Sequence, residues 1–111
     1  MTVQDIFPAE ISLGQRRGAR LIDVREPAEY ECGHLPGAVN IPLAKLRGNQ
    51  EFGGSPVVLV CARDSRSAQA AALLLEAGHA DVANLLGGTL GWMQEHRPVD
   101  FLPVEAAQSQ A

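Results

Sequence analysis

Residues 57–67, VVLVCARDSRS, place four branched apolar residues directly before a cysteine and then a short segment of cations and hydroxyls. A short apolar run that follows a proline is typical of a strand buried on both faces of a parallel sheet. Residues 67–77 are rich in alanine and leucine, and Gly78 follows them where the end of a helix favours a positive φ. The stretch therefore predicts a buried strand, a loop that begins at Cys61, and a helix.

The rest of the chain repeats this alternation of strand and helix. Similar apolar runs occur at residues 20–24, 38–41 and 81–85, of which the last two are weaker. Helices are expected at residues 27–31 and 89–96, and the beginning up to about Gly18 stays undecided because Gly14 interrupts any helical period. Alternating strands and helices predict an α/β fold in which helices cover both faces of a mostly parallel sheet.

Length and composition indicate one compact domain. The chain has 111 residues, 46% of them hydrophobic and 20% charged, with a formal net charge of −4. We assign residues 1–103 to the domain and expect residues 104–111, rich in alanine, glutamine and serine, to form a frayed or disordered tail. The chain shows no basic stripe of the kind that nucleic acid requires, so nucleic acid is an unexpected partner.

The sequence also predicts a cytoplasmic protein without a membrane partner. No apolar run approaches the roughly 18 to 20 residues of a membrane span, and the N-terminus lacks the basic start and apolar block of a secretory signal. The two cysteines, Cys32 and Cys61, are too few for a disulfide framework. We therefore interpret both as thiols.

The position of Cys61 suggests a chemical role. In open parallel sheets ligands bind beyond the carboxyl ends of the strands, and Cys61 follows such an end and precedes a helix that starts near Arg66. The amides of residues 62–67 are therefore expected to form a concavity of N–H donors, supported by the helix dipole, that suits an anion. Cysteines at helix N-termini or beside cations ionise more readily than a free thiol, so we expect Cys61 to act as a thiolate nucleophile.

Three further blocks carry a resemblance to a known family. They are residues 21–26 (LIDVRE), followed by Glu29 and Tyr30, then residues 33–43 (GHLPGAVNIPL) and 87–92 (GGTLGW). In this order and spacing, together with the Cys61 loop, they resemble a single-domain rhodanese, a member of a sulfurtransferase family. The resemblance implies a five-stranded, mostly parallel sheet flanked by helices on both faces. It also implies that Cys61 accepts a sulfane sulfur and becomes a persulfide.

The loop that follows the strand departs from the family pattern at two positions. The family usually has Cys-Arg-x-Gly-x-Arg-Ser/Thr, and this chain has Cys61, Ala62, Arg63, Asp64, Ser65, Arg66 and Ser67. By the resemblance, Cys61 is the catalytic residue and residues 62–67 bind the substrate. We expect Arg63 to replace the cation that is lost at Ala62. Asp64 opposes anion binding unless it turns outward or pairs with Arg63 or Arg66.

Three other residues are open to two interpretations. Asp23 and Arg25 close a neighbouring strand at the same edge of the sheet, where they either line the site or form an ion pair that fixes the turn. Cys32 is interpreted as a structural or incidental thiol, and a resolving cysteine is the alternative.

The resemblance implies a sulfur donor and a sulfur acceptor and neither a metal nor an organic cofactor. The expected donor is a small anion such as thiosulfate or a persulfide, the acceptor is a thiol or cyanide, and a sulfur-relay protein is a further possible partner. Two alternatives stay open. One is a sulfur-carrier or docking module with weak activity. The other is a cysteine phosphatase or arsenate reductase, which has five residues between cysteine and arginine, whereas four separate Cys61 from Arg66.

Overall fold

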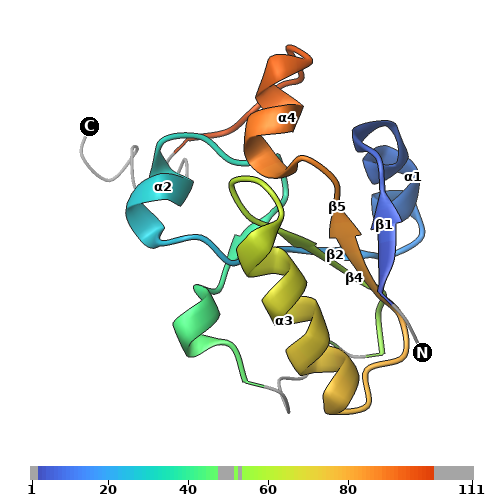
Figure 1. Cartoon of the computed structure of the whole chain (residues 1–111). Coiled ribbons are helices and arrows are strands. Elements are labelled where there is room, and N and C mark those ends of the chain that lie inside the picture. The colour runs from blue at the N-terminus through green and yellow to red at the C-terminus, as the bar shows by residue number, and fades with distance from the viewer. Residues whose placement is uncertain (1–2, 48–51, 53, 102–111) are drawn as a thin grey trace, which may run out of the picture.

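The computed structural model describes residues 3–47, 52 and 54–101, which form one five-stranded sheet in the order β1-β5-β4-β2-β3 (Figure 1). The strands are β1 (Gln4–Ile6), β2 (Arg20–Asp23), β3 (Val39–Asn40), β4 (Val57–Val60) and β5 (Val82–Leu85). The helices are α1 (Ile11–Arg16), α2 (Pro27–Glu31), α3 (Ser65–Glu76) and α4 (Gly88–Gln94), with 3-10 turns η1 (Pro8–Glu10) and η2 (Leu43–Lys45). All strand pairs are parallel, which confirms the predicted α/β fold.

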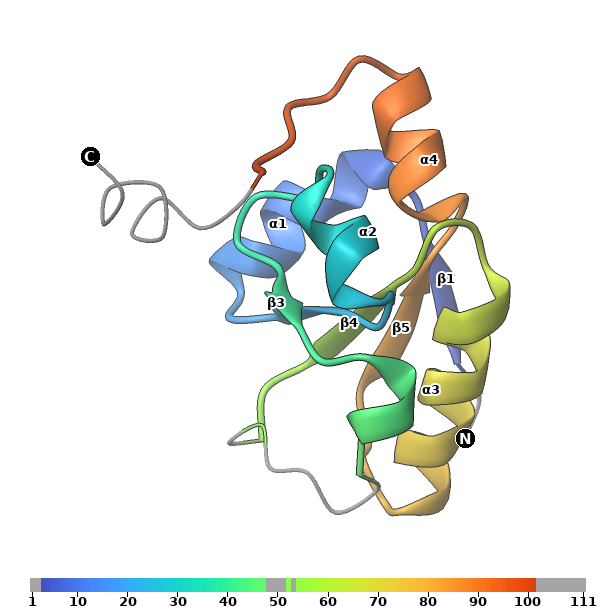
Figure 2. The ribbon, with the colours of Figure 1, turned by 90° about the vertical axis from the view of Figure 1, so that its left-hand side faces the viewer.

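Two apolar cores lie on opposite faces of the sheet. On one face α3 packs its buried Ala70, Ala71 and Leu74 against Leu59 of β4, and the small alanines let the helix approach the strands closely. On the other face Trp92 of α4 packs in a cluster with residues of α1, α2 and the strands. Figure 2 shows α3 on one side of the strands and α1 on the other. All four residues of β4 are buried, as a strand covered on both faces requires.

The four strands expected from sequence are present, and the ambiguous N-terminal region supplies the fifth. β1 has three residues, mostly exposed, and pairs only with β5, so its sequence QDI carries no strong strand pattern. The helix after Cys61 begins at Ser65, slightly earlier than expected. The last helix ends at Gln94, before His96, which adopts a positive φ of 58°. The expected tail, residues 104–111, lies outside the described residues.

The register of the strands gathers their carboxyl ends at one edge. Asp23 of β2 lies opposite Val60 of β4, and Leu59 of β4 lies opposite Asn84 of β5. The amide of Val24 donates to the carbonyl of Val60 at 2.9 Å, which extends the pairing by one residue. The loop that starts at Cys61 therefore emerges between the ends of β2 and β5, where Figure 1 shows it facing α2 and α4.

Within the described part of the chain, no helix combines the length and the apolar character that crossing a bilayer would need.

Candidate active site

Cys61 stands directly after β4 and is 1% exposed. The first turn of α4 holds the backbone next to it, since the amide of Thr89 donates to the carbonyl of Cys61 at 2.8 Å and that of Leu90 to the carbonyl of Ala62 at 3.0 Å. Gly88 makes this approach possible. A Cβ at Gly88 would lie 2.4 Å from the carbonyl oxygens of both Cys61 and Arg63, and its φ of +58° also favours glycine.

The carbonyls of the loop are thus occupied, whereas its amides are not. Among the described residues, the amides of positions 62–67 donate none of the hydrogen bonds of turns and loops, and α3 begins within the loop at Ser65. The first amides of a helix have no partner inside the helix and carry its positive dipole. The loop therefore has backbone N–H groups without an acceptor directly after Cys61, and the prediction that they bind an anion stays a prediction.

Arg66 is paired with a residue that sequence reasoning did not select. Its Nη1 donates to Oε1 of Glu29 at 2.6 Å and its Nη2 donates to Oε2 at 2.9 Å, a bidentate ion pair between α3 and α2. Hydrogen bonding by Arg66 lowers the pKa of Glu29 to about 2, against the opposing effect of burial. Hydrogen bonding to Glu29 likewise raises the pKa of Arg66, and the nearby Cys61 adds to this. About a third of each side chain stays exposed, so the pair lies at the rim of the site.

Asp64 is exposed, which agrees with the outward orientation that was one of the two expected for it. Its carboxylate accepts a hydrogen bond of 3.1 Å from the amide of Gly87, and it makes no ion pair with Arg63 or Arg66. Its φ of −136° is negative and lies outside the left-handed region that favours glycine, so replacing the family's glycine here does not force an aspartate into that region. Arg63 is exposed, and within the described residues it forms no ion pair, which leaves its charge available to an anion at the loop.

Ser67 connects the sulfur to the middle of the sheet. Its Oγ lies 3.2 Å from Sγ of Cys61 and 3.1 Å from the carbonyl oxygen of Asp64. It also donates a hydrogen bond to Oδ1 of Asn84, and Nδ2 of Asn84 donates to Oδ1 of Asp5 at 3.3 Å. Ser67 and Asn84 are buried, whereas Asp5 is exposed. The thiol therefore belongs to a polar network that reaches β1.

Asp23 and Arg25 form the buried ion pair that was one of their two interpretations. Nε of Arg25 donates to Oδ1 of Asp23 at 3.0 Å, Nη2 donates to Oδ2 at 2.9 Å, and the same Nη2 donates to the carbonyl of Gly33 at 2.8 Å. The pair thus joins the end of β2 to the loop after α2. It also acts on the site electrostatically, since Arg25 contributes to the low pKa of Glu29 and Asp23 to the high pKa of Arg66.

Cys32 lies apart from this network. It is exposed, forms no disulfide, and caps the C-terminus of α2. Within the described residues, no three histidine, cysteine, aspartate or glutamate side chains gather as a metal site requires.

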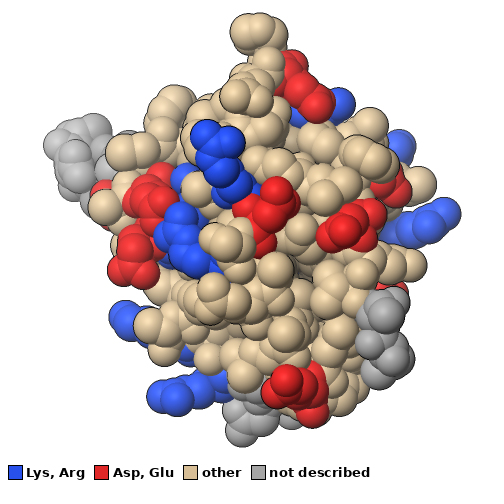
Figure 3. Space-filling model, in the orientation of Figure 1, with Lys and Arg blue, Asp and Glu red and all other residues tan. Residues whose placement is uncertain are grey.

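Sequence reasoning selected the loop and missed its partners Glu29, Asn84 and Asp5. Asn84 carries a signal in retrospect, because it is a polar residue inside the otherwise apolar strand β5. Glu29 belongs to the residues that resemble the family, but it lies 37 residues before Arg66 on the short helix α2, and no local pattern links the two. On the face that Figure 3 shows, acidic and basic side chains are interspersed. Two arginines of the site, Arg25 and Arg66, are likewise paired with the carboxylates of Asp23 and Glu29.

The chain matches the model of the rhodanese-like domain family over residues 8–95, which contain the Cys61 loop and the four helices of the described residues. The chain belongs to the rhodanese-like domain family. Its relatives include rhodanese-like sulfurtransferases. It is 46% identical over 85 residues to the uncharacterized protein YqhL of Bacillus subtilis, a match that covers 75% of this chain and 67% of YqhL. It is 31% identical over 108 residues to the thiosulfate sulfurtransferase GlpE of Pseudomonas aeruginosa, with 95% of this chain and 96% of GlpE covered.

Longer relatives contain the domain as one part. The probable adenylyltransferase/sulfurtransferase MoeZ of Mycobacterium tuberculosis is 34% identical over 99 residues, and this rhodanese-like domain spans about a quarter of its length (25%). Among solved structures, the rhodanese-related protein of Thermoplasma volcanium superimposes with a TM-score of 0.77 at 28% identity. That match covers 87% of this chain and 97% of the other. The sheet order and the flanking helices are thus those of a rhodanese fold.

Proposed function

We propose that this rhodanese-like domain is a sulfurtransferase that moves a sulfane sulfur from thiosulfate or a persulfide to a thiol or cyanide through a persulfide on Cys61. The observation that carries the proposal is the buried Cys61 directly before a loop whose amides donate no hydrogen bond within the described residues, at the N-terminus of α3. The thiosulfate sulfurtransferase GlpE, which matches this chain over almost its whole length, supports the same activity.

The chemistry proceeds in two displacements. The thiolate of Cys61 attacks the outer sulfur of thiosulfate, a new S–S bond forms, and sulfite leaves with the electron pair of the bond that breaks. The acceptor then attacks the terminal sulfur of the persulfide, which returns Cys61 to the thiolate and releases thiocyanate when the acceptor is cyanide. The amides of residues 62–67 stabilise the negative charge on the terminal sulfur, which needs no acid or base of its own.

Burial of Cys61 restricts the donors that this site accepts. Because only 1% of Cys61 is exposed, the reacting sulfur of the donor must pass between the surrounding residues to reach Sγ. A sulfur atom at the tip of a small donor meets this requirement better than a tetrahedral phosphoryl group, and the four-residue spacing between Cys61 and Arg66 acts in the same direction. A phosphatase activity is accordingly disfavoured.

A sulfur-carrier role is the second candidate, and the Arg66–Glu29 pair favours it. The carboxylate of Glu29 occupies both nitrogens of the guanidinium that would otherwise bind a free anion. A protein-bound persulfide carries less negative charge than thiosulfate and depends less on that guanidinium. The sulfurtransferase relative MoeZ, of which this domain covers one part, is consistent with sulfur delivered within a larger assembly.

Intact mass spectrometry under non-reducing conditions tests the persulfide. Incubation with thiosulfate is expected to add one sulfur atom to the wild-type protein and to the Cys32→Ser variant, but none to Cys61→Ser. Cys32 is the matched control because it is the more exposed thiol, so simple accessibility would favour it. A label on Cys32, or no label on either thiol with thiosulfate or a small persulfide, contradicts the proposed function.

A further inference from the structure

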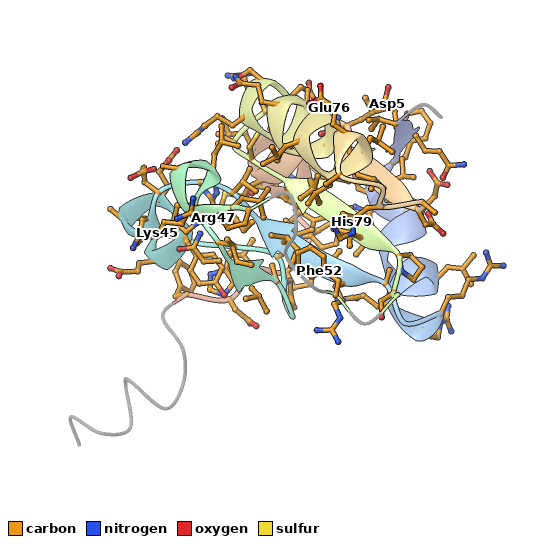
Figure 4. All side chains as sticks on the ribbon, turned by 90° about the horizontal axis from the view of Figure 1, so that it is seen from below. Asp5, Lys45, Arg47, Phe52, Glu76 and His79 are labelled. Carbon is orange, nitrogen blue, oxygen red and sulfur yellow. The ribbon has the colours of Figure 1, made fainter. Side chains whose placement is uncertain are left out.

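A chain of polar contacts runs from the surface of the sheet to the thiol. Asn84 of β5 lies opposite Asp5 of β1 in the strand register, and its Nδ2 donates to Oδ1 of Asp5 at 3.3 Å. Figure 4 shows Asp5 on β1 near α3. Oδ1 of Asn84 accepts from Ser67 on α3, whose Oγ lies 3.2 Å from Sγ of Cys61. Two buried polar side chains thus join an exposed carboxylate to a buried thiol.

The carboxylate of Asp5 decides how the amide of Asn84 is oriented. An ionised carboxylate has only acceptors, whereas an amide has an acceptor oxygen and a donor nitrogen. The amide nitrogen therefore faces Asp5 and the amide oxygen faces Ser67. The opposite orientation would place two acceptors against each other at the 3.3 Å contact and lose this hydrogen bond.

The orientation of Asn84 in turn decides where the proton of Ser67 lies. A serine hydroxyl has one proton, and Oδ1 of Asn84 and the carbonyl oxygen of Asp64 have none to share. The Ser67 hydroxyl has these two oxygens as acceptors, so its proton points to one of them and not to Sγ of Cys61. Ser67 presents a lone pair to Sγ of Cys61, so the thiol hydrogen must be the donor in the 3.2 Å contact. In this arrangement Ser67 stabilises the neutral thiol and gives nothing to the thiolate.

We propose that Asp5 and Asn84 are positioning residues that hold Cys61 as a thiol in the resting protein. A half-turn of the Asn84 amide reverses the network. When the thiol gives its proton to water, the turned amide donates from Nδ2 to Ser67, and the Ser67 hydroxyl then donates to the thiolate of Cys61. The ionised carboxylate of Asp5 opposes this turn, because it would then face the amide oxygen.

The inference rests on the proposed role of Cys61 as the nucleophile. It identifies residues outside the loop that control how readily the Cys61 thiol ionises. The charged groups of this network and of the loop come from β1, the end of β2, α2, the loop and the first turn of α3, and they are Asp5, Asp23, Arg25, Glu29, Arg63, Asp64 and Arg66. Helix α4, whose sequence is GTLGWMQ, contributes no charge. All of these groups except Asp5 are left in place by the variants that test the inference.

The test follows the ultraviolet absorbance of the thiolate against pH in a Cys32→Ser background, where Cys61 is the only thiol. This absorbance reports ionisation without requiring a reagent to reach the buried sulfur. Asp5→Asn keeps the size of the side chain and allows both orientations of the Asn84 amide. We expect the midpoint of the titration to fall by roughly one pH unit, as one hydrogen bond to the charged form requires. Asn84→Leu removes the acceptor and is expected to shift the midpoint in the same direction.

A serine-free background separates the network from a simple charge effect. Loss of the Asp5 charge would also favour the thiolate through space, and that contribution does not depend on Ser67. In Ser67→Ala, Asp5→Asn is therefore expected to lower the midpoint by this through-space contribution alone, which is a smaller shift than in the protein that keeps Ser67. An equal shift with and without Ser67, a rise, or no shift in Asp5→Asn alone overturns the inference. The titration is readable whether or not sulfur is transferred, so failure of the proposed function would be seen separately by mass spectrometry.

Discussion

Glu29→Gln offers the sharpest test of how Arg66 is used. In the structure the two oxygens of Glu29 accept from both terminal nitrogens of Arg66, at 2.6 and 2.9 Å. Glutamine keeps the length of the side chain and one acceptor oxygen but removes the charge. Arg66 then stands beside the loop as an uncompensated cation, and we expect thiosulfate to saturate the enzyme at lower concentration.

The size of the effect follows from the charge that is released. One unit charge about 4 Å from another contributes about 1 kcal/mol in the dielectric of water. Both partners are about one-third exposed, so the water value is the appropriate one and salt screens it further. A gain of about 1 kcal/mol corresponds to a roughly fivefold lower half-saturating concentration, since 1.4 kcal/mol is tenfold. The effect should shrink as ionic strength rises.

The assay is cyanide-dependent formation of thiocyanate over a range of thiosulfate concentrations, at low and at high salt. Glu95→Gln is the matched control, because Glu95 pairs with Arg97 at 2.7 Å with similar exposure and lies outside the Cys61 network. It should leave saturation unchanged. A higher half-saturating concentration in Glu29→Gln would refute the reasoning, since it would mean that Glu29 holds Arg66 in its binding position.

Three further predictions concern the loop and its rim. Gly88→Ala should lower the free energy of unfolding, measured by chemical denaturation, by roughly 2 to 5 kcal/mol, because its Cβ would meet two carbonyl oxygens at 2.4 Å. The control Gly78→Ala also has a positive φ, +100°, but no atom within 4 Å, and it should lower the free energy of unfolding by about 1 to 2 kcal/mol. The pKa of Glu29 is lowered from 4.5 to about 2, so the pair stabilises the fold fully above pH 4.5, and the difference in unfolding free energy between wild type and Glu29→Gln should shrink as pH falls toward 2. Hydrolysis of an aryl phosphate should be absent, and hydrolysis that disappears in Cys61→Ser would favour a phosphatase instead.

The central elements could be predicted from sequence because their signals are local. The run VVLV is apolar at every position and is buried at every position, since the sheet is covered on both faces. β1 could not be predicted in the same way. Its three residues form an edge strand whose place depends on pairing with β5, far away in the chain. Propensity and periodicity contain no information on such a pairing.

The candidate site also has parts that sequence could predict and parts that it could not. Cys61 and the loop amides follow from a strand, a turn and a helix that are adjacent in sequence. The partner of Arg66 does not, because Glu29 is brought to it by the packing of α2 near α3. The orientation of Asp64 also depended on a distant group, the amide of Gly87 at the start of α4. Sequence therefore predicted that Arg66 and Ser67 lie close to Cys61, but not that Arg66 is paired with Glu29 or that Ser67 contacts Asn84.

The pairing of these charged side chains affects which kind of sulfur donor the site favours, a free anion or a protein-bound persulfide. The arginine at the rim is neutralised by Glu29, and the carboxylate of Asp64 is held by an amide, so Arg63 is the cation of the loop that forms no ion pair among the described residues. A doubly charged donor thus depends on Arg63 and the loop amides, whereas a less charged persulfide depends mainly on the amides. Truncation of Arg63 should then weaken thiosulfate far more than a persulfide donor, and equal losses for both would place donor recognition in the amides alone.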